Sequence, residues 1–306
     1  MNIIYDLKQL KAPLKSTVLT IGNFDGVHWG HLMLFEKVKE RAKAIEGQAA
    51  VMTFEPHPVK VMKPKNGPHL ITPTEQKLNL IWDSGIDVIF CMPFTTQFAS
   101  ISAHDFVKDI LVDKIGIKEI VVGYDYTFGH NRQGNITLLQ QMGENLHFRV
   151  HALEPVRINQ TLVSSTHIRE LIQEGNLSEA KRLLGRDYQI CGTVIKGKNR
   201  GARLLGYPTA NLKLIDELVP KRGVYAVTVI VDDELYYGVT NIGYNPTFSD
   251  NALSIETHLL DFSGSLLGQK IKLNFIQRLR DEKTFKSVQE LSKQIARDIQ
   301  RAKTLF

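Results

Sequence analysis

The sequence predicts an α/β domain followed by a small antiparallel β-barrel with a terminal helix. The chain has 306 residues, which is enough for two domains of ordinary size. From Ser16 to about Val156, short β-branched and apolar runs alternate with helical patterns, as in a doubly wound parallel sheet. From Tyr188 to Ile276 the apolar runs are extended and separated by turn signals, as in a small barrel. We therefore expect one domain over residues 1–186 and a second over residues 187–306.

The strands of the first domain are predicted from five short apolar runs: Thr17–Ile21, Ala49–Phe54, Val88–Met92, Glu119–Val122 and His147–Leu153. Between them, apolar residues spaced three and four apart predict helices over Leu32–Ile45, Thr74–Trp82, Ala103–Ile115 and Ile136–Met142. Ligands of such sheets bind beyond the carboxyl ends of the strands. The loops that follow the strands are therefore the first place to look for a site.

Two short helices are expected between the sheet and the barrel. The side-chain oxygens of Ser164–Thr166 favour a helix start. Asn176 and Glu179 form a capping box for a second helix over Leu177–Leu184, which Gly185 ends.

The barrel and the final helix follow. Asp232-Asp233 supplies a hairpin turn between two extended runs. An amphipathic helix over about Thr284–Ala302 places four apolar residues on one face, namely Val288, Leu291, Ile295 and Ile299.

Composition excludes several classes of protein. No apolar run is long enough for a membrane span and the first residues do not resemble a secretion signal, so we expect a cytoplasmic protein without a membrane partner. Cys91 and Cys191 lie in apolar contexts and are interpreted as small core residues. A net charge of +6 favours anionic partners, and it fits phosphate-bearing small molecules as well as nucleic acid.

The segment from Gly22 to His31 joins the first predicted strand to the first helix. Its three glycines allow close approach of a ligand, and a helix start presents unpaired N–H groups with a partial positive charge. His28 and His31, three residues apart, can both donate hydrogen bonds to phosphate oxygens. The simpler interpretation is a pair of surface or capping histidines.

This segment resembles the HxGH motif of the nucleotidyltransferase superfamily, and the fuller GNFDGVHWGH resembles bacterial FAD synthetase. Three further stretches match that family in order: Phe54–Pro58, Gly123–Gly129 and Ser164–Arg169. Each begins where a ligand-facing loop or a helix start is expected.

The resemblance implies adenylyl transfer from ATP to FMN, with release of pyrophosphate. Positioning and positive charge on the phosphoryl oxygens supply most of the catalysis in such a reaction. By resemblance, the catalytic residues are His28, His31 and Arg169. The ATP-binding residues are Gly22, Asn23, Phe24, Asp25, His28, His31, Ser164, Ser165, Thr166 and Arg169. The FMN-binding residues are Phe54, His57, Asp125, Phe128 and Arg132.

A second site is expected in the barrel. Residues 192–198 spell a phosphate loop, but Asn199 stands where magnesium needs Ser or Thr, and no helix follows. The basic loop over Lys196–Arg203 lacks interleaved aromatics, so we do not expect a nucleic-acid partner.

Gly206–Leu212 resembles the PTAN motif of riboflavin kinases, and Asn241–Phe248 and Glu256–Phe262 match that family's later motifs. Two positions depart from the family pattern. Ala202 stands where a glycine is usual, and Asn245 where an arginine is frequent.

Oxygens of Thr209 and Asn211, two residues apart on an extended segment, can coordinate Mg²⁺ together with nucleotide phosphates. Glu256 can accept the proton of the alcohol that attacks the γ-phosphate of ATP. The alternative for Glu256 is a solvated strand carboxylate. The residues expected to bind ATP and magnesium are Gly197, Lys198, Arg203, Thr209 and Asn211.

Together the motifs resemble the bifunctional riboflavin kinase/FAD synthetases. The resemblance implies that the chain converts riboflavin and ATP to FMN and ADP, and FMN and ATP to FAD and pyrophosphate, with Mg²⁺ in both steps. Other interpretations are another small-molecule nucleotidyltransferase, a tRNA synthetase, and a nucleic-acid-binding or regulatory protein that keeps the flavin fold as a sensor. The sequence leaves the oligomeric state open.

Overall fold

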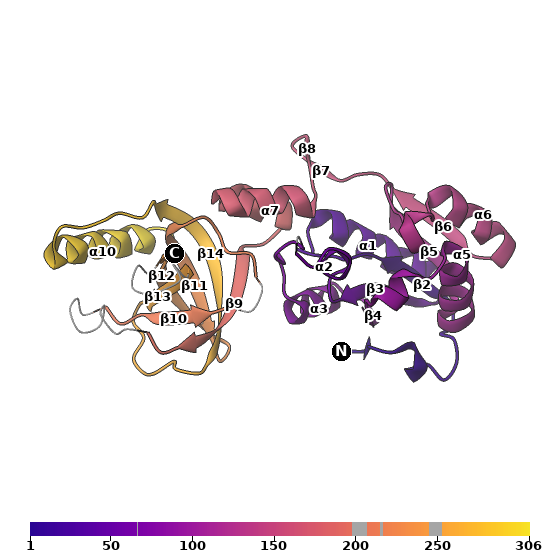
Figure 1. Ribbon diagram of the computed structural model, residues 1–306, viewed down its shortest axis with the longest axis horizontal. Helices are drawn as coiled ribbons and strands as arrows, with labels where there is room; N and C mark the ends of the chain where they lie inside the picture. The colour runs from indigo at the N-terminus through magenta and orange to yellow at the C-terminus, as the bar shows by residue number, and fades with distance from the viewer. Residues whose placement is uncertain (66, 198–206, 215–216, 245–252) are drawn as a thin grey trace. The chain divides into compact units, whose positions relative to one another are not determined.

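A computed structural model describes residues 1–65, 67–197, 207–214, 217–244 and 253–306. The chain forms two compact units, Met1–Ser164 and Ser165–Phe306 (Figure 1). No helix in the described ranges is long and apolar enough to cross a membrane.

The first unit contains a six-stranded parallel sheet. Its strands are β1 (Ile3–Ile4), β2 (Thr17–Ile21), β3 (Gln48–Glu55), β4 (Val88–Pro93), β5 (Ile117–Gly123) and β6 (Arg149–Leu153), in the order β1-β4-β3-β2-β5-β6. All five predicted strands are confirmed, and the two-residue β1 was not predicted. The order reverses between β2 and β5, which places the end of β2 at the topological switch point of the sheet.

Helices cover both faces of this sheet (Figure 1). They are α1 (Trp29–Ala44), α2 (Pro58–Met62), α3 (Thr74–Asp83), α4 (Thr96–Ala99), α5 (Ala103–Asp105), the π-helical η2 (Phe106–Ile115) and α6 (Ile136–Leu146). Short 3₁₀ turns lie at η1 (Leu7–Gln9) and η3 (His130–Arg132), and β7 (Arg157–Ile158) pairs with β8 (Thr161–Leu162). Val18 packs in the core with α1 and α3, whereas the next residue, Leu19, packs in the core with η2 and α6. The alternation along β2 thus fills both faces.

The second unit opens with α7 (Ser165–Glu174) and α8 (Leu177–Leu184), which confirm the two short helices. The capping box is only half formed. Asn176 accepts a hydrogen bond from the Glu179 N–H (3.4 Å), but the Glu179 carboxylate accepts from Arg182, and the Asn176 N–H donates to Leu171 O. A charged partner one turn away therefore competes successfully for the glutamate.

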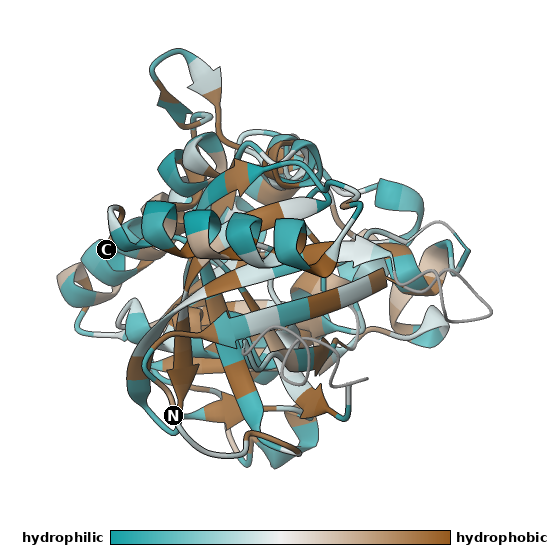
Figure 2. Ribbon diagram, turned by 90° about the vertical axis from the view of Figure 1, so that its left-hand side faces the viewer, coloured by the Kyte–Doolittle hydropathy of each residue, from teal (hydrophilic) through white to brown (hydrophobic). Residues whose placement is uncertain are grey.

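Six antiparallel strands then form a closed barrel. They are β9 (Tyr188–Ile195), β10 (Ala210–Lys213), β11 (Gly223–Val231), β12 (Glu234–Tyr244), β13 (Leu253–Leu259) and β14 (Lys270–Arg280), in the order β10-β13-β12-β11-β14-β9. The predicted hairpin turn is confirmed, since Asp232 and Asp233 have φ of 48° and 66° between β11 and β12. In Figure 2 the strands carry most of the hydrophobic residues, and the outer helix surfaces are largely hydrophilic.

The terminal helix α10 (Val288–Lys303) begins about four residues later than predicted, because Ser287 caps it by accepting a hydrogen bond from the Glu290 N–H (3.1 Å). Ile299 is buried against the barrel. Arg280 on β14 forms a two-pronged ion pair with Asp298 on α10, with Nη2 2.7 Å from Oδ2. This charged pair fastens the helix to the barrel.

Both cysteines have free thiols. Cys91 is buried in the first core, as predicted, whereas Cys191 is only half-buried. The interpretation of both cysteines as core residues is therefore confirmed for Cys91, whereas Cys191 is less buried than expected.

Candidate active sites

The loop between β2 and α1 has the conformation that a tight ligand-binding turn requires. Phe24, Gly26 and Val27 all have positive φ (50°, 93° and 39°). The Phe24 ring folds back over Gly22, where an added Cβ would lie 2.9 Å from the ring. A side chain at position 22 would collide with this ring, which favours glycine at the end of β2.

The two motif histidines are brought together at the start of α1. Their rings stack with centroids 3.6 Å apart and an interplanar angle of 19°, and Phe24 packs edge-on against His31 at 5.1 Å. His28 occupies the N-cap position, but its side chain does not cap the first turn of α1. The simple capping interpretation therefore fails for His28. The pair lies at the helix N-terminus and the switch point, where a phosphate is favoured.

Asp25 holds the shape of this loop. It is 3% exposed, and its carboxylate accepts hydrogen bonds from the backbone N–H groups of Ile71 (3.2 Å) and Thr72 (3.0 Å). The Gly26 N–H donates to the Thr72 hydroxyl (2.9 Å). The loop is thereby fixed to the segment that leads into α3, and a contact of Asp25 with ATP stays a prediction.

The predicted flavin residues Phe54 and Phe128 belong to one aromatic cluster. Phe54 packs against Phe94 (5.5 Å) and Phe98 (5.7 Å), and Phe98 reaches Phe128 through Phe106. These side chains lie at or after the carboxyl ends of β3, β4 and β5, or on the helices that follow. An apolar, partly exposed wall of this kind suits a flat aromatic ring system.

Tyr126 stacks on Phe128 at 5.5 Å and extends this wall. Burial raises the pKa of its phenol above the ordinary value. Phe94 and Phe98 were missed from the sequence, although two phenylalanines four apart directly after a strand were a usable signal.

The other predicted flavin residues are His57, Asp125 and Arg132. His57 caps α2, with Nδ1 accepting a hydrogen bond from the Val59 N–H (3.2 Å). Asp125 and Arg132 are both exposed on the segment between β5 and α6. Their contact with flavin stays a prediction.

The predicted second phosphate-binding element falls at the division between the units. Ser164 ends the first unit, whereas Ser165, Thr166 and Arg169 belong to α7 in the second. Arg169 is half-buried, and its Nη1 donates to Ser165 O (3.3 Å). The role of these residues at the phosphates of ATP stays a prediction.

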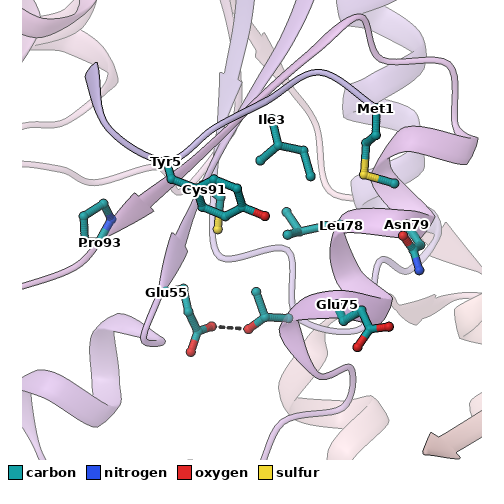
Figure 3. Close-up of a pocket in the computed structure, with 10 residues that line it drawn as sticks. Met1, Ile3, Tyr5, Glu55, Glu75, Leu78, Asn79, Cys91 and Pro93 are labelled. Carbon is teal, nitrogen blue, oxygen red and sulfur yellow. Dashed lines mark hydrogen bonds between the residues drawn. The ribbon is translucent and has the colours of Figure 1, made fainter. Parts of the chain in front are cut away.

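A separate cavity of about 460 Å³ opens between β1, the ends of β3 and β4, and α3 (Figure 3). Its walls include Tyr5, Leu78 and Cys91, together with Glu55, whose carboxylate accepts a hydrogen bond from the Thr74 hydroxyl. None of the predicted site residues that the structure describes lines it. Its relevance is that the Glu55–Thr74 bond joins α3 to the end of β3.

In the barrel, Glu256 occupies the middle of a polar row. On β13 it pairs in register with Asn211 on β10 and with Asn241 on β12. The neighbouring pair, Thr240 and Thr257, is fully buried with hydroxyl oxygens 2.8 Å apart. Because side chains alternate along a strand, the row around Glu256 faces the opposite side of the sheet from this pair.

The Glu256 carboxylate lines a cavity of about 460 Å³ beside α10. The polar residues of its wall also include Tyr207, Thr209, Asn241 and His258. The apolar residues include Val224, Val239, Phe285, Leu291 and Ile295. The volume is within the range of small-molecule sites. The predicted base, Glu256, and one predicted magnesium ligand, Thr209, therefore line the same cavity. From the sequence, the apolar face of α10 that lines this cavity was interpreted only as a packing face.

Burial raises the pKa of the Glu256 carboxyl above its ordinary value. A solvated strand carboxylate would not show this, so that alternative is not supported. A raised pKa makes a carboxylate a stronger base for an attacking alcohol.

Gly197 lies against the predicted magnesium ligand Asn211. A Cβ added at Gly197 would come 2.1 Å from Asn211 Nδ2, so a larger residue there would displace the Asn211 side chain. Lys198, Arg203 and the departures at Ala202 and Asn245 lie outside the described residues.

Comparison with known proteins gives the same two parts. A family model described as FAD synthetase matches residues 10–167, and one described as riboflavin kinase matches residues 184–306. The bifunctional riboflavin kinase/FMN adenylyltransferase of Buchnera aphidicola is 38% identical, over 98% of this chain and 96% of its own. The protein of the same name from Pseudomonas fluorescens is 38% identical, over 100% of this chain and 98% of its own.

Among solved structures, a Streptococcus pneumoniae protein described as a macrolide-efflux protein matches with a TM-score of 0.88. It is 31% identical and covers 98% of both chains. Two family models in tandem and full-length curated relatives agree on the family. The chain belongs to the bifunctional riboflavin kinase/FMN adenylyltransferases.

Proposed function

We propose that the two reactions of the family use separate sites on this chain, one at the loop Gly22–His31 and one around Glu256. In the first, a phosphate oxygen of FMN attacks the α-phosphorus of ATP, and the bond to pyrophosphate breaks. His28 and His31 donate hydrogen bonds to the phosphoryl oxygens, and the N-terminus of α1 adds positive potential. Support comes from the stacked histidine pair at the helix start.

The aromatic cluster around Phe54 and Phe128 is proposed to hold the isoalloxazine ring of FMN. We propose His57, Asp125 and Arg132 for the remainder of the flavin nucleotide. Ser164, Ser165, Thr166 and Arg169 are proposed to bind the phosphates of ATP, and Gly22, Asn23, Phe24 and Asp25 to shape the rest of the ATP pocket.

In the second site, the ribityl hydroxyl of riboflavin attacks the γ-phosphorus of ATP, ADP leaves, and Glu256 accepts the hydroxyl proton. The observation that carries this role is the half-buried carboxylate in a cavity whose wall combines apolar side chains with polar and charged ones, in register with Asn211. The apolar wall from α10 excludes water, which would otherwise compete with riboflavin for the phosphoryl group.

Magnesium fits the donor set at the start of β10. Thr209 and Asn211 offer neutral oxygens, and Mg²⁺ commonly takes one or two protein oxygens with phosphates and water. In the described residues no group of three or more His, Cys, Asp or Glu side chains forms a metal cluster. When bound, Mg²⁺ neutralises charge on the transferring phosphates. Gly197, Lys198 and Arg203 are proposed to contact the nucleotide.

We retain 1–186 and 187–306 as the proposed limits of the two catalytic domains, and the cytoplasm as the proposed location. The proposed small-molecule partners are riboflavin, FMN, FAD, ATP, ADP and pyrophosphate, without nucleic acid or membrane.

Incubation of the chain with riboflavin and Mg-ATP, followed by chromatography, tests this proposal. We expect FMN to appear first and FAD second. The variant His28→Ala/His31→Ala should accumulate FMN without FAD. If the unsubstituted chain forms neither product, a regulatory flavin sensor becomes the better interpretation.

A further inference from the structure

The segment from Ile71 to Lys77 lies outside every recognised motif, yet it contacts both loops of the proposed adenylylation site. Ile71 and Thr72 hold Asp25 of the Gly22–His31 loop through their backbone N–H groups. Thr74 donates to the Glu55 carboxylate at the end of β3 (Figure 3). The start of α3 therefore fixes the two loops relative to each other.

Lys77 completes this arrangement from the interior. It is 5% exposed and lies on the buried face of α3 with Leu78 and Ile81. Its Nζ donates to Phe54 O (3.1 Å) and to Asn23 O (3.3 Å). One amino group thus bridges the main chain after β2 and the main chain near the end of β3.

The position of Lys77 is costly for stability. Burial lowers the pKa of its amino group, and the carboxylates of Glu55 and Asp25 offset this desolvation only in part. An apolar side chain of similar length would fill the same place on the helix face without this cost. The amino group of this buried lysine donates to the carbonyls of two loops, which suggests a role in the site rather than in the core.

A path of contacts leads from Lys77 to the catalytic histidines. The Asn23 carbonyl also accepts from the Thr53 hydroxyl (3.1 Å) and precedes Phe24, whose φ is 50°. The Phe24 ring packs at right angles to the His31 ring. A shift of the peptide between Asn23 and Phe24 therefore moves the surface against which His31 packs.

The second carbonyl leads to the flavin side. Phe54 O accepts from Lys77, and the Phe54 ring is part of the aromatic cluster with Phe94. The same amino group thus sets the positions of both the nucleotide loop and the proposed flavin wall.

We infer that Lys77 is a positioning residue for FMN adenylylation, which holds the loop Gly22–His31 and the loop after Phe54 at the spacing that brings FMN to the α-phosphate of ATP. The inference rests on the proposed function of the first site. Small displacements of bound reactants cost large factors in rate, so the effect of losing this bridge is catalytic.

The variant Lys77→Met tests the inference, because methionine keeps most of the side-chain volume and removes the donors. We expect kcat for FMN adenylylation to fall at least tenfold, while the riboflavin kinase activity of the same preparation stays within twofold of the unsubstituted chain. The urea midpoint of the first unit should not fall. Both tryptophans, Trp29 and Trp82, lie in that unit, so their fluorescence reports its unfolding.

Two matched variants complete the experiment. Lys43→Met makes the same change at an exposed lysine of α1 and should leave both activities unchanged. Lys77→Arg restores donors to the two carbonyls and should recover more of the adenylylation rate than Lys77→Met.

The outcomes separate the inference from the proposed function. His31→Ala is measured in parallel: if it leaves adenylylation unchanged, the proposed site itself is wrong. If His31→Ala abolishes adenylylation while Lys77→Met keeps the rate within twofold, only the inference is overturned. A rate loss in Lys77→Met that merely follows a lower urea midpoint, or failure of the first unit to fold, assigns Lys77 a structural role and also overturns it.

Discussion

Glu119 on β5 offers a prediction whose size follows from the structure. Its side chain is 2% exposed and accepts hydrogen bonds from Arg41 Nε (2.7 Å) and Nη2 (2.9 Å), and His151 Nε2 lies 2.7 Å from Oε2. This group joins α1, β5 and β6 in the first unit. We predict that Glu119→Gln destabilises that unit.

The Arg41 guanidinium holds the pKa of Glu119 at about 2, compared with an ordinary value of 4.5. At about 1.4 kcal/mol for each tenfold change in proton affinity, this corresponds to about 3 kcal/mol. Arg41 and His151 are 23% and 25% exposed, so solvent screens the interaction and we expect about 1–2 kcal/mol. Because the folded pKa is the lower one, this stability is present above pH 4.5 and is lost as the pH falls toward 2.

Urea unfolding followed by tryptophan fluorescence measures the effect in the first unit alone. The difference between Glu119→Gln and the unsubstituted chain should be largest near pH 7 and should shrink as the pH falls below 4.5. Glu40→Gln is the control, since Glu40 is exposed and forms its ion pair with Lys37 across one turn. An unchanged midpoint in Glu119→Gln at pH 7, or a difference that stays constant to pH 3, refutes the reasoning.

Three further predictions concern the sites. His31→Ala should lower the rate of adenylylation by about 10²–10³-fold, the usual cost of one lost transition-state donor, and leave the urea midpoint unchanged. A loss of stability that accounts for the loss of rate would indicate a core histidine. Because burial raises the pKa of Glu256, the rate of riboflavin phosphorylation should fall off on the acid side at a pH above 4.5, and a fall-off at or below that value contradicts its role as base. Asp298→Asn removes the charge partner of Arg280, so α10 should pack less firmly against the barrel. The KM for riboflavin should then rise several-fold, and an unchanged KM would show that the helix wall does not contact riboflavin.

Most of the fold was readable from the sequence because both sheets are built from strongly patterned runs. The β2 strand lies over the residues predicted for it, Thr17–Ile21, since every residue in it is buried and a turn signal follows. By contrast β1 has only two residues, and its pairing of Ile3 with Ile89 depends on a contact far along the chain. No local pattern could have predicted that strand.

The arrangement of the candidate site residues could be predicted in part. Spacing brought His28 and His31 together correctly, and strand register brought Asn211 to Glu256. The role of α10 as a cavity wall was missed, because an apolar helix face looks the same whether it covers a core or a substrate. Lys77 was also missed, although a lysine at helical spacing with Leu78 and Ile81 is a detectable break in an apolar stripe.

The most direct test of the two-site account is the product pattern of Glu256→Gln. This substitution keeps the size of the side chain and removes the base, so riboflavin with Mg-ATP should give no FMN at a useful rate. When FMN is supplied with Mg-ATP, the same variant should form FAD at the rate of the unsubstituted chain, because the histidine pair belongs to the other unit. Loss of FAD formation from supplied FMN in a folded Glu256→Gln protein would contradict the separation of the two sites.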